Sequence, residues 1–144
     1  ALTLRTSIIG HEVTRHASLV DWFLNQPETK VQGFAKAIYT GVTTLEFARM
    51  LADVVLPRSD LSGLYHVASS AISKFELLGL VSEVYGWKGV IVRSDSFQCD
   101  RSMVADRLLA ATGCGPPDWE TMIRSMREHR PPWFSTPNLG SRRT

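Results

Sequence analysis

The sequence lacks the patterns that mark secreted, metal-binding and membrane-spanning proteins. It contains two cysteines, Cys99 and Cys114, which are too few for a disulfide framework and form no Cys-x-x-Cys pair for zinc or redox exchange. No segment approaches the ~18 consecutive apolar residues of a transmembrane helix, and no charged segment followed by an apolar one indicates a secretory signal. We therefore expect a cytoplasmic location, reduced thiols, no membrane contact and no metal ligands.

A strong charge of one sign is also absent. Sixteen Lys and Arg residues oppose fourteen Asp and Glu residues, so the net charge is +2. Proteins that bind nucleic acid through phosphates need many basic groups, and we therefore expect no nucleic-acid partner. With 144 residues, 44% of them hydrophobic, the chain can fill the core of one domain and is not disordered as a whole.

Common catalytic motifs are missing. There is no Gly-x-Gly-x-x-Gly or Gly-x-x-x-x-Gly-Lys-Ser/Thr loop for a phosphate, no Gly-x-Ser-x-Gly elbow and no His-Glu-x-x-His pair. Ser70 and Lys74 lie four residues apart, as a nucleophile and a base could, but Ser73 and Lys74 begin a helix and capping explains them better. We assign no catalytic residue.

The sequence does contain alternating strand and helix patterns, which indicate an α/β fold. An apolar, β-branched strand covers Thr3–Ile9, so that the chain begins as if in the middle of a domain. A helix with an apolar face from Leu19 to Phe23 ends before Pro27. Residues 31–39 are predicted as short extended pieces.

Two capping boxes predict the next helices. Thr43 with Glu46, and Ser73 with Glu76, place a hydroxyl and a carboxylate three residues apart before an apolar pattern. The second helix continues to Val84. The first has an apolar stripe at helical spacing, and its buried residues are predicted to be Leu45, Ala48, Leu51, Ala52 and Val55.

The remaining elements follow the same alternation. Short strands are predicted at 64–68 and 90–92, and a helix begins at Asp100 or Ser102 and ends at Gly113.

A last helix completes the predicted domain, residues 1–128. Asp118 caps it after two prolines, and we interpret residues 129–144 as an extended or disordered tail. The predicted inner face of the helix is Trp119, Met122, Ile123 and Met126.

Arg101 is the candidate anion-binding residue that the spacing alone suggests. It directly precedes the helix predicted to begin near Ser102, and an arginine beside helix N–H groups can bind a diphosphate. A surface arrangement of Asp100 and Arg101 explains the same residues equally well. Composition and spacing therefore indicate an α/β domain with one candidate anion site.

Five segments, taken in order, resemble the extended short-chain dehydrogenase/reductases of the NAD-dependent epimerase/dehydratase superfamily. Within that superfamily they are most similar to the dTDP-4-dehydrorhamnose reductase group, and the resemblance covers Leu2 to Met126. The segments are Leu4–Gly10 (LRTSIIG), Gly41–Ala48 (GVTTLEFA), Ser62–Val67 (SGLYHV), Ile72–Lys74 (ISK) and Pro116–Glu120 (PPDWE).

The resemblance implies the C-terminal half of such an enzyme: the last Rossmann strands with a small substrate-binding subdomain. In this family a strand like the one at Leu4 follows a helix that carries a catalytic Tyr-x-x-x-Lys pair. The implied cofactor, NAD(P)H, would then be bound mainly by a missing N-terminal half. No tyrosine here has the lysine four positions later, since Tyr39, Tyr65 and Tyr85 are followed by Thr43, Ser69 and Gly89.

The resemblance also implies site residues. Thr6 and Ser7 match the segment that passes beside the nicotinamide and the sugar. Arg101 lies where an arginine of the family meets the nucleotide diphosphate, although Asp-Arg-Ser replaces the commoner Arg-Pro pairing. His11 follows the Ser7 strand into a loop and is a further substrate-binding candidate, with a solvated loop histidine as the alternative.

The implied parent enzyme reduces a nucleotide-linked 4-keto sugar, as in dTDP-rhamnose and polysaccharide biosynthesis. This chain would bind the nucleotide sugar, associate with the missing half and be inactive alone, and an oligomer is possible. Two alternatives stay open: a sugar-nucleotide epimerase or dehydratase of the same superfamily, and a non-catalytic binding module. An upstream in-frame glycine-rich loop with Tyr-x-x-x-Lys would favour the enzyme.

Overall fold

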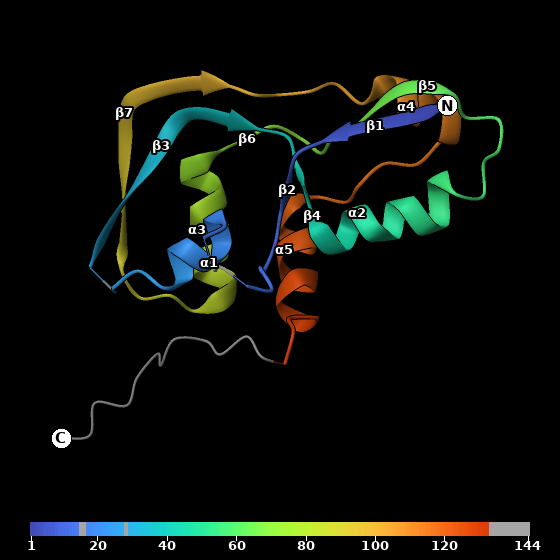
Figure 1. The fold of residues 1–144 in the computed structure, drawn as a ribbon. Helices are drawn as coiled ribbons and strands as arrows, with labels where there is room; N and C mark the ends of the chain where they lie inside the picture. Colours follow the sequence, from blue (N-terminus) through green and yellow to red (C-terminus); the bar gives the residue numbers. More distant parts are fainter. Residues whose placement is uncertain (15–16, 28, 133–144) are drawn as a thin grey trace.

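Three short sheets and the helices between them make up the fold (Figure 1). The computed structural model describes residues 1–14, 17–27 and 29–132. Strand β1 (Leu2–Thr6) pairs in parallel with β5 (Gly63–Val67), and β2 (Ile8–Ile9) pairs in parallel with β4 (Val42–Thr43). The single strand predicted over Thr3–Ile9 is thus divided at Ser7, where the chain leaves one sheet and enters the next.

The third sheet has two long strands. Strand β3 (Lys30–Tyr39) runs parallel to β7 (Val90–Asp100) and antiparallel to the short β6 (Ile72–Ser73). Figure 1 shows β3 and β7 curving around α1 (Leu19–Leu24) and α3 (Lys74–Tyr85). The sequence predicted short pieces here and a strand of three residues at 90–92. That prediction was too short because β7 carries mostly polar residues after Val92 and is exposed over most of its length.

Helix α3 (Lys74–Tyr85) matches its prediction. The capping box is complete, since Ser73 Oγ accepts from the N–H of Glu76 and the Glu76 carboxylate accepts from the N–H of Ser73. Gly86 ends the helix with a φ of 74°. The inner face of α3, including Leu77, Leu78 and Val81, is buried.

Helix α2 (Thr44–Met50) continues as the π-helix η1 (Leu51–Val55). Thr43 caps it as predicted, but the Glu46 side chain pairs with Arg49 instead of returning to the cap. The predicted buried face is largely wrong, because α2 turns Glu46 and Met50 toward the core, and the π-helix then buries Val54 beside Val55. Of the predicted residues Val55 is buried and Leu51 half-buried, whereas Leu45, Ala48 and Ala52 are exposed.

Two helices close the fold. Helix α4 (Asp106–Thr112) ends at Gly113 as predicted, but it begins later than predicted because β7 extends to Asp100 and residues 101–105 cross to the other sheet. Helix α5 (Trp119–Glu128) is capped by the Asp118 side chain, which accepts from the N–H of Thr121 at 2.7 Å. All four residues predicted for its inner face are buried.

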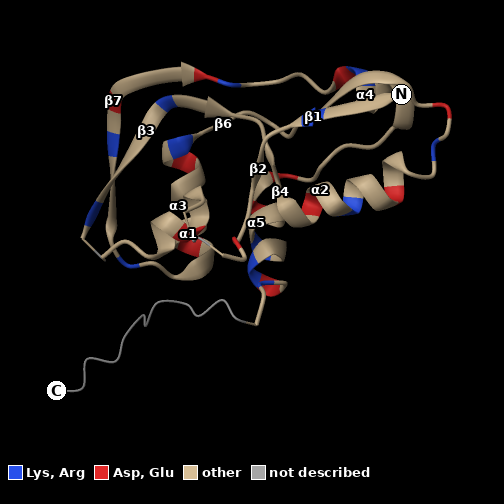
Figure 2. Cartoon of the chain, in the orientation of Figure 1, with Lys and Arg blue, Asp and Glu red and all other residues tan. Residues whose placement is uncertain are grey.

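The predicted tail lies mostly outside the described residues, which end at Pro132. Within the described ranges, no helix combines the length and apolar character that a bilayer crossing needs. Figure 2 shows acidic and basic residues interspersed along the elements, as the small net charge leads one to expect.

Candidate functional site

The carboxyl ends of β1 and β5 lie side by side and carry hydroxyl groups. Thr6 pairs with Val67 at the last step of the parallel ladder, and Thr6 Oγ1 donates to the Val67 carbonyl at 2.8 Å. Ser7 follows, and its carbonyl accepts from the N–H of Val42 at 3.0 Å. Ligands of α/β proteins bind beyond the carboxyl ends of parallel strands, so this edge is the candidate functional site.

Hydrogen bonds connect this edge to the neighbouring segments. Ser69, just after β5, donates its N–H to the Thr40 carbonyl at 2.8 Å and its Oγ to the Gly41 carbonyl at 2.5 Å. Thr40 Oγ1 in turn accepts from the N–H of Met103 at 2.8 Å. The segments that follow β3, β5 and β7 are therefore held together at one place.

A cavity of about 650 Å³ opens beside these bonds. Hydroxyl-bearing residues line one part of it, namely Thr40, Ser69, Ser70 and Ser102, and apolar side chains such as Met50 and Leu108 line another. Its size falls in the range of small-molecule sites. Such a lining can hydrogen-bond a polyhydroxylated ligand over an apolar floor.

Arg101 lies in a different environment from the one predicted. No helix follows it directly; the Asp100 carboxylate accepts from the N–H of Ser102 at 2.9 Å, and α4 has only seven residues. The prediction that Arg101 and the start of a helix together form an anion site is therefore wrong. The N–H of Arg101 continues the β3–β7 pairing by donating to the Ile38 carbonyl at 3.1 Å.

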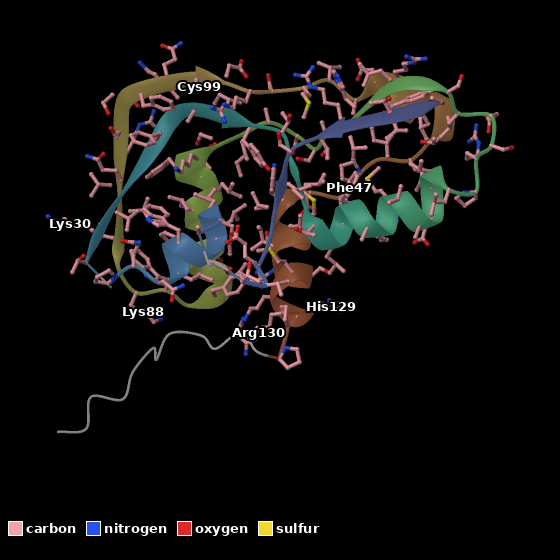
Figure 3. All side chains as sticks on the ribbon, viewed as in Figure 1. Lys30, Phe47, Lys88, Cys99, His129 and Arg130 are labelled. Carbon is pink, nitrogen blue, oxygen red and sulfur yellow. The ribbon has the colours of Figure 1, made fainter. Side chains whose placement is uncertain are left out.

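A smaller cavity of about 200 Å³ receives Arg101 instead. Tyr39 and Lys74 also line it, as does Cys99, which Figure 3 shows on β7. Thr6 and Ser7 line neither this cavity nor the larger one, so the structure does not bring them into one cavity with Arg101.

His11 is buried and held by two side chains. Its Nδ1 lies 2.7 Å from Asp21 Oδ1, and its Nε2 lies 2.8 Å from the Tyr85 hydroxyl. The His11 side chain is 4% exposed, so the alternative of a solvated loop histidine is wrong. Burial raises the pKa of Tyr85 above its ordinary value. These contacts fix the loop after β2, and the substrate role of His11 stays a prediction.

Tyr39 has an unusual environment that the sequence did not predict, since its only sequence feature of note was that Thr43, not lysine, lies four positions later. Its hydroxyl is the one buried side-chain polar atom, among the described residues, that has no hydrogen-bond partner. Burial raises the pKa of Tyr39 to about 12. A Cβ on Gly41 would overlap the Tyr39 hydroxyl and the Ser7 carbonyl, so the phenol lies next to Ser7.

The described residues contain no group of three or more His, Cys, Asp and Glu side chains that could hold a metal ion. Cys99 and Cys114 are free thiols. For a nicotinamide cofactor, Thr6 Oγ1 already donates to the Val67 carbonyl and could only accept a hydrogen bond, so Thr6 and Ser7 fit a contact with the cofactor and not its main binding site.

The similarity of this chain to known proteins lies in its fold. No family model and no curated protein matches the sequence. Among solved structures, a dTDP-4-dehydrorhamnose reductase from Bacillus anthracis in complex with NADP matches with a TM-score of 0.69 at 18% identity, over 90% of this chain and 48% of that chain.

Other sugar-nucleotide enzymes match similarly. A dTDP-glucose 4,6-dehydratase from Bacillus anthracis in complex with NAD has a TM-score of 0.65 and 11% identity, over 88% of this chain and 43% of that chain. A UDP-N-acetylglucosamine 4-epimerase from Bacillus cereus has a TM-score of 0.64 and 12% identity, over 88% and 45% of the two chains.

The chain therefore has an α/β fold similar to roughly half of an extended short-chain dehydrogenase/reductase. It spans about half the length of the solved proteins that it matches. Of the three, the reductase was solved with NADP and the dehydratase with NAD.

Proposed function

We propose that this chain is the substrate-binding, C-terminal half of an NAD(P)-dependent sugar-nucleotide oxidoreductase that reduces a nucleotide-linked 4-keto sugar. One observation carries the proposal: the hydroxyl-bearing carboxyl edge of β1 and β5 lies within a fold that matches about half of a dTDP-4-dehydrorhamnose reductase. The ordered segments that resemble this group add sequence support.

The sheet supports the existence of a partner half. Parallel sheets are almost always covered on both faces, and a pair of short strands is marginal by itself. Strands β1 and β5 form such a pair, and Leu2 and Leu64 on them are 37% and 45% exposed. We assign to the open side of this pair a cofactor-binding α/β unit that adds further parallel strands.

The proposal divides the work between the halves. This chain orients the sugar at the Ser7 edge and holds the charged end of the nucleotide with Arg101. Bound nicotinamide supplies a hydride to the keto carbon, and a proton donor from the partner half completes the reduction. No tyrosine of the sequence has a lysine four positions later, and we therefore expect no reduction by this chain alone.

The test joins this chain to a cofactor-binding half and follows NADPH or NADH oxidation with dTDP-4-keto sugars. We expect oxidation that depends on the sugar and on both halves. No oxidation with any nucleotide-linked 4-keto sugar would contradict the reductase.

A sugar-nucleotide epimerase or dehydratase is the second candidate, because structures of both classes match nearly as well. Product analysis separates the candidates: reduction consumes the cofactor, whereas epimerisation and dehydration return it. Nucleotide-sugar binding without turnover would instead favour a non-catalytic module.

A further inference from the structure

Lys74 is the first residue of α3, where a positive charge is unfavourable. Backbone N–H groups give the start of a helix a partial positive charge, so acidic residues are preferred there. Glu76 does lie in the first turn, but the N–H and Oγ of Ser73 hold its carboxylate at 3.0 and 2.8 Å. Figure 2 shows the basic colour at the start of α3. A residue that opposes local helix stability is a candidate for function.

Two aromatic rings hold the ammonium group of Lys74. Its Nζ lies 5.6 Å from the ring centroid of Trp22 and 5.6 Å from that of Phe34. Phe34 packs in turn against Phe97, with centroids 5.3 Å apart. The rings attract the cation and fix its position without neutralising its charge.

Lys74 and Arg101 line the same cavity of about 200 Å³ between α1, β3, α3 and β7. No carboxylate lines this cavity, and in the described part of the chain neither cation forms an ion pair. The neighbouring carboxylate of Asp100 is occupied by the N–H of Ser102. The other lining residues are uncharged and mainly apolar, namely Leu19, Ala37, Ile38, Tyr39, Leu77, Phe97 and Cys99.

Two unpaired cations beside an apolar cavity complement a ligand with a flat apolar part and an anionic part. We propose that Lys74 is a second phosphate-binding residue, which acts with Arg101 on the diphosphate of a nucleotide whose ring occupies this cavity. The inference rests on the proposed function for the ligand class, since it names the residue that completes the cation pair. This role does not disturb the helix cap, because Ser73 is the capping residue and Lys74 would contact the ligand through its side chain alone.

The test titrates dTDP into the full chain by calorimetry at two salt concentrations. Lys74→Met removes the charge and keeps most of the apolar stem, whereas Lys74→Arg keeps a cation. Lys30→Met is the matched control, because Lys30 is exposed and Figure 3 places it at the far end of β3 from Cys99 and the cavity. Thermal unfolding of each variant reports whether it folds.

We expect Lys74→Met to weaken dTDP binding roughly tenfold or more, the size of one lost charge-assisted contact. Its unfolding temperature should change little, since the loss of the attraction to the two rings is offset by the removal of a positive charge from the helix start. Lys74→Arg should keep most of the affinity, and Lys30→Met all of it. Thymidine should bind weakly to every variant without this dependence on Lys74.

Two results would overturn the inference: no dTDP binding by the unaltered chain, or unchanged binding by a folded Lys74→Met variant. Its failure is distinguishable from failure of the proposed function. If the joined halves reduce a 4-keto sugar and Lys74→Met leaves KM unchanged, the binding role of Lys74 is wrong and the proposed function stands. If dTDP binding depends on Lys74 but no 4-keto sugar is reduced, the reductase function is wrong and the binding site stands.

Discussion

At the scale of residues, two buried polar side chains differ in whether they have hydrogen-bond partners. His11 in the loop after β2 and Tyr39 at the end of β3 both have buried polar atoms, but His11 is hydrogen-bonded on both ring nitrogens and the Tyr39 hydroxyl has no partner in the described part of the chain. A buried hydroxyl without a partner costs stability, whereas a hydrogen-bonded histidine contributes to it.

Tyr39→Phe should therefore raise the free energy of unfolding by about 1 kcal/mol, because it removes an unsatisfied hydroxyl and preserves the ring packing against Trp119. Urea unfolding measures the difference. A loss of stability of similar size would mean that the hydroxyl has a partner in solution and would contradict the present geometry.

His11→Ala should destabilise the chain by about 3 kcal/mol, since it leaves the buried Asp21 carboxylate without its imidazole. If His11 only stabilises the loop after β2, a folded His11→Ala variant should bind a nucleotide sugar with nearly unchanged affinity. Selective loss of binding without loss of stability would support the substrate role predicted from the sequence.

Only the local features of the candidate site could be predicted from the sequence. Thr6 and Ser7 lie at the end of a strand, as predicted, and their role in binding stays a prediction. The surroundings of Lys74 and Tyr39 could not be predicted, because they depend on the pairing of β3 with β7, which brings together residues about sixty positions apart in the chain.

At the scale of elements, local signals predicted the helices better than the strands. The caps at Ser73 and Asp118 each lie within three residues of the group that they bind, and both were found. Strand β7 carries mostly polar residues after Val92 and is defined by its hydrogen bonds with β3. Its length could therefore not be predicted from the spacing of apolar residues. The buried face of α2 was also mispredicted, since Glu46 and Met50 face the core in place of Leu45 and Ala48.

Ser73→Ala should reduce stability by about 1 kcal/mol, because the N–H of Glu76 loses its acceptor at the start of α3. Chemical unfolding measures the effect. Ser62→Ala is a suitable control, since Ser62 is an exposed turn residue that caps no helix. Equal effects of the two substitutions would contradict the capping assignment.

The same cap gives stability a dependence on pH. Hydrogen bonds from Ser73 lower the pKa of Glu76 below its ordinary value of 4.5. The carboxylate therefore stabilises the fold above pH 4.5, and this contribution is lost as the pH falls through the lowered pKa. The stability difference between the unaltered chain and Glu76→Gln should be present near neutral pH and vanish in acid. A difference that grows in acid would contradict this assignment.

At the scale of the whole molecule, the exposed apolar side chains indicate an uncovered surface. Leu45 on α2 and Leu64 on β5 are 38% and 45% exposed, and Leu109 on α4 is 53% exposed. We expect the 144-residue chain to self-associate or unfold at low denaturant concentration, and co-expression with a cofactor-binding half to correct both. Light scattering and unfolding curves test this, and a stable monomer with sharp, cooperative unfolding would contradict it.

The central claim is that this chain binds the sugar nucleotide and leaves the cofactor to a partner half. The most direct measurement compares calorimetric titrations of the chain with a dTDP-linked sugar and with NADPH. The account predicts saturable binding of the dTDP-linked sugar and little binding of NADPH. Tight binding of NADPH without binding of the sugar nucleotide would contradict it.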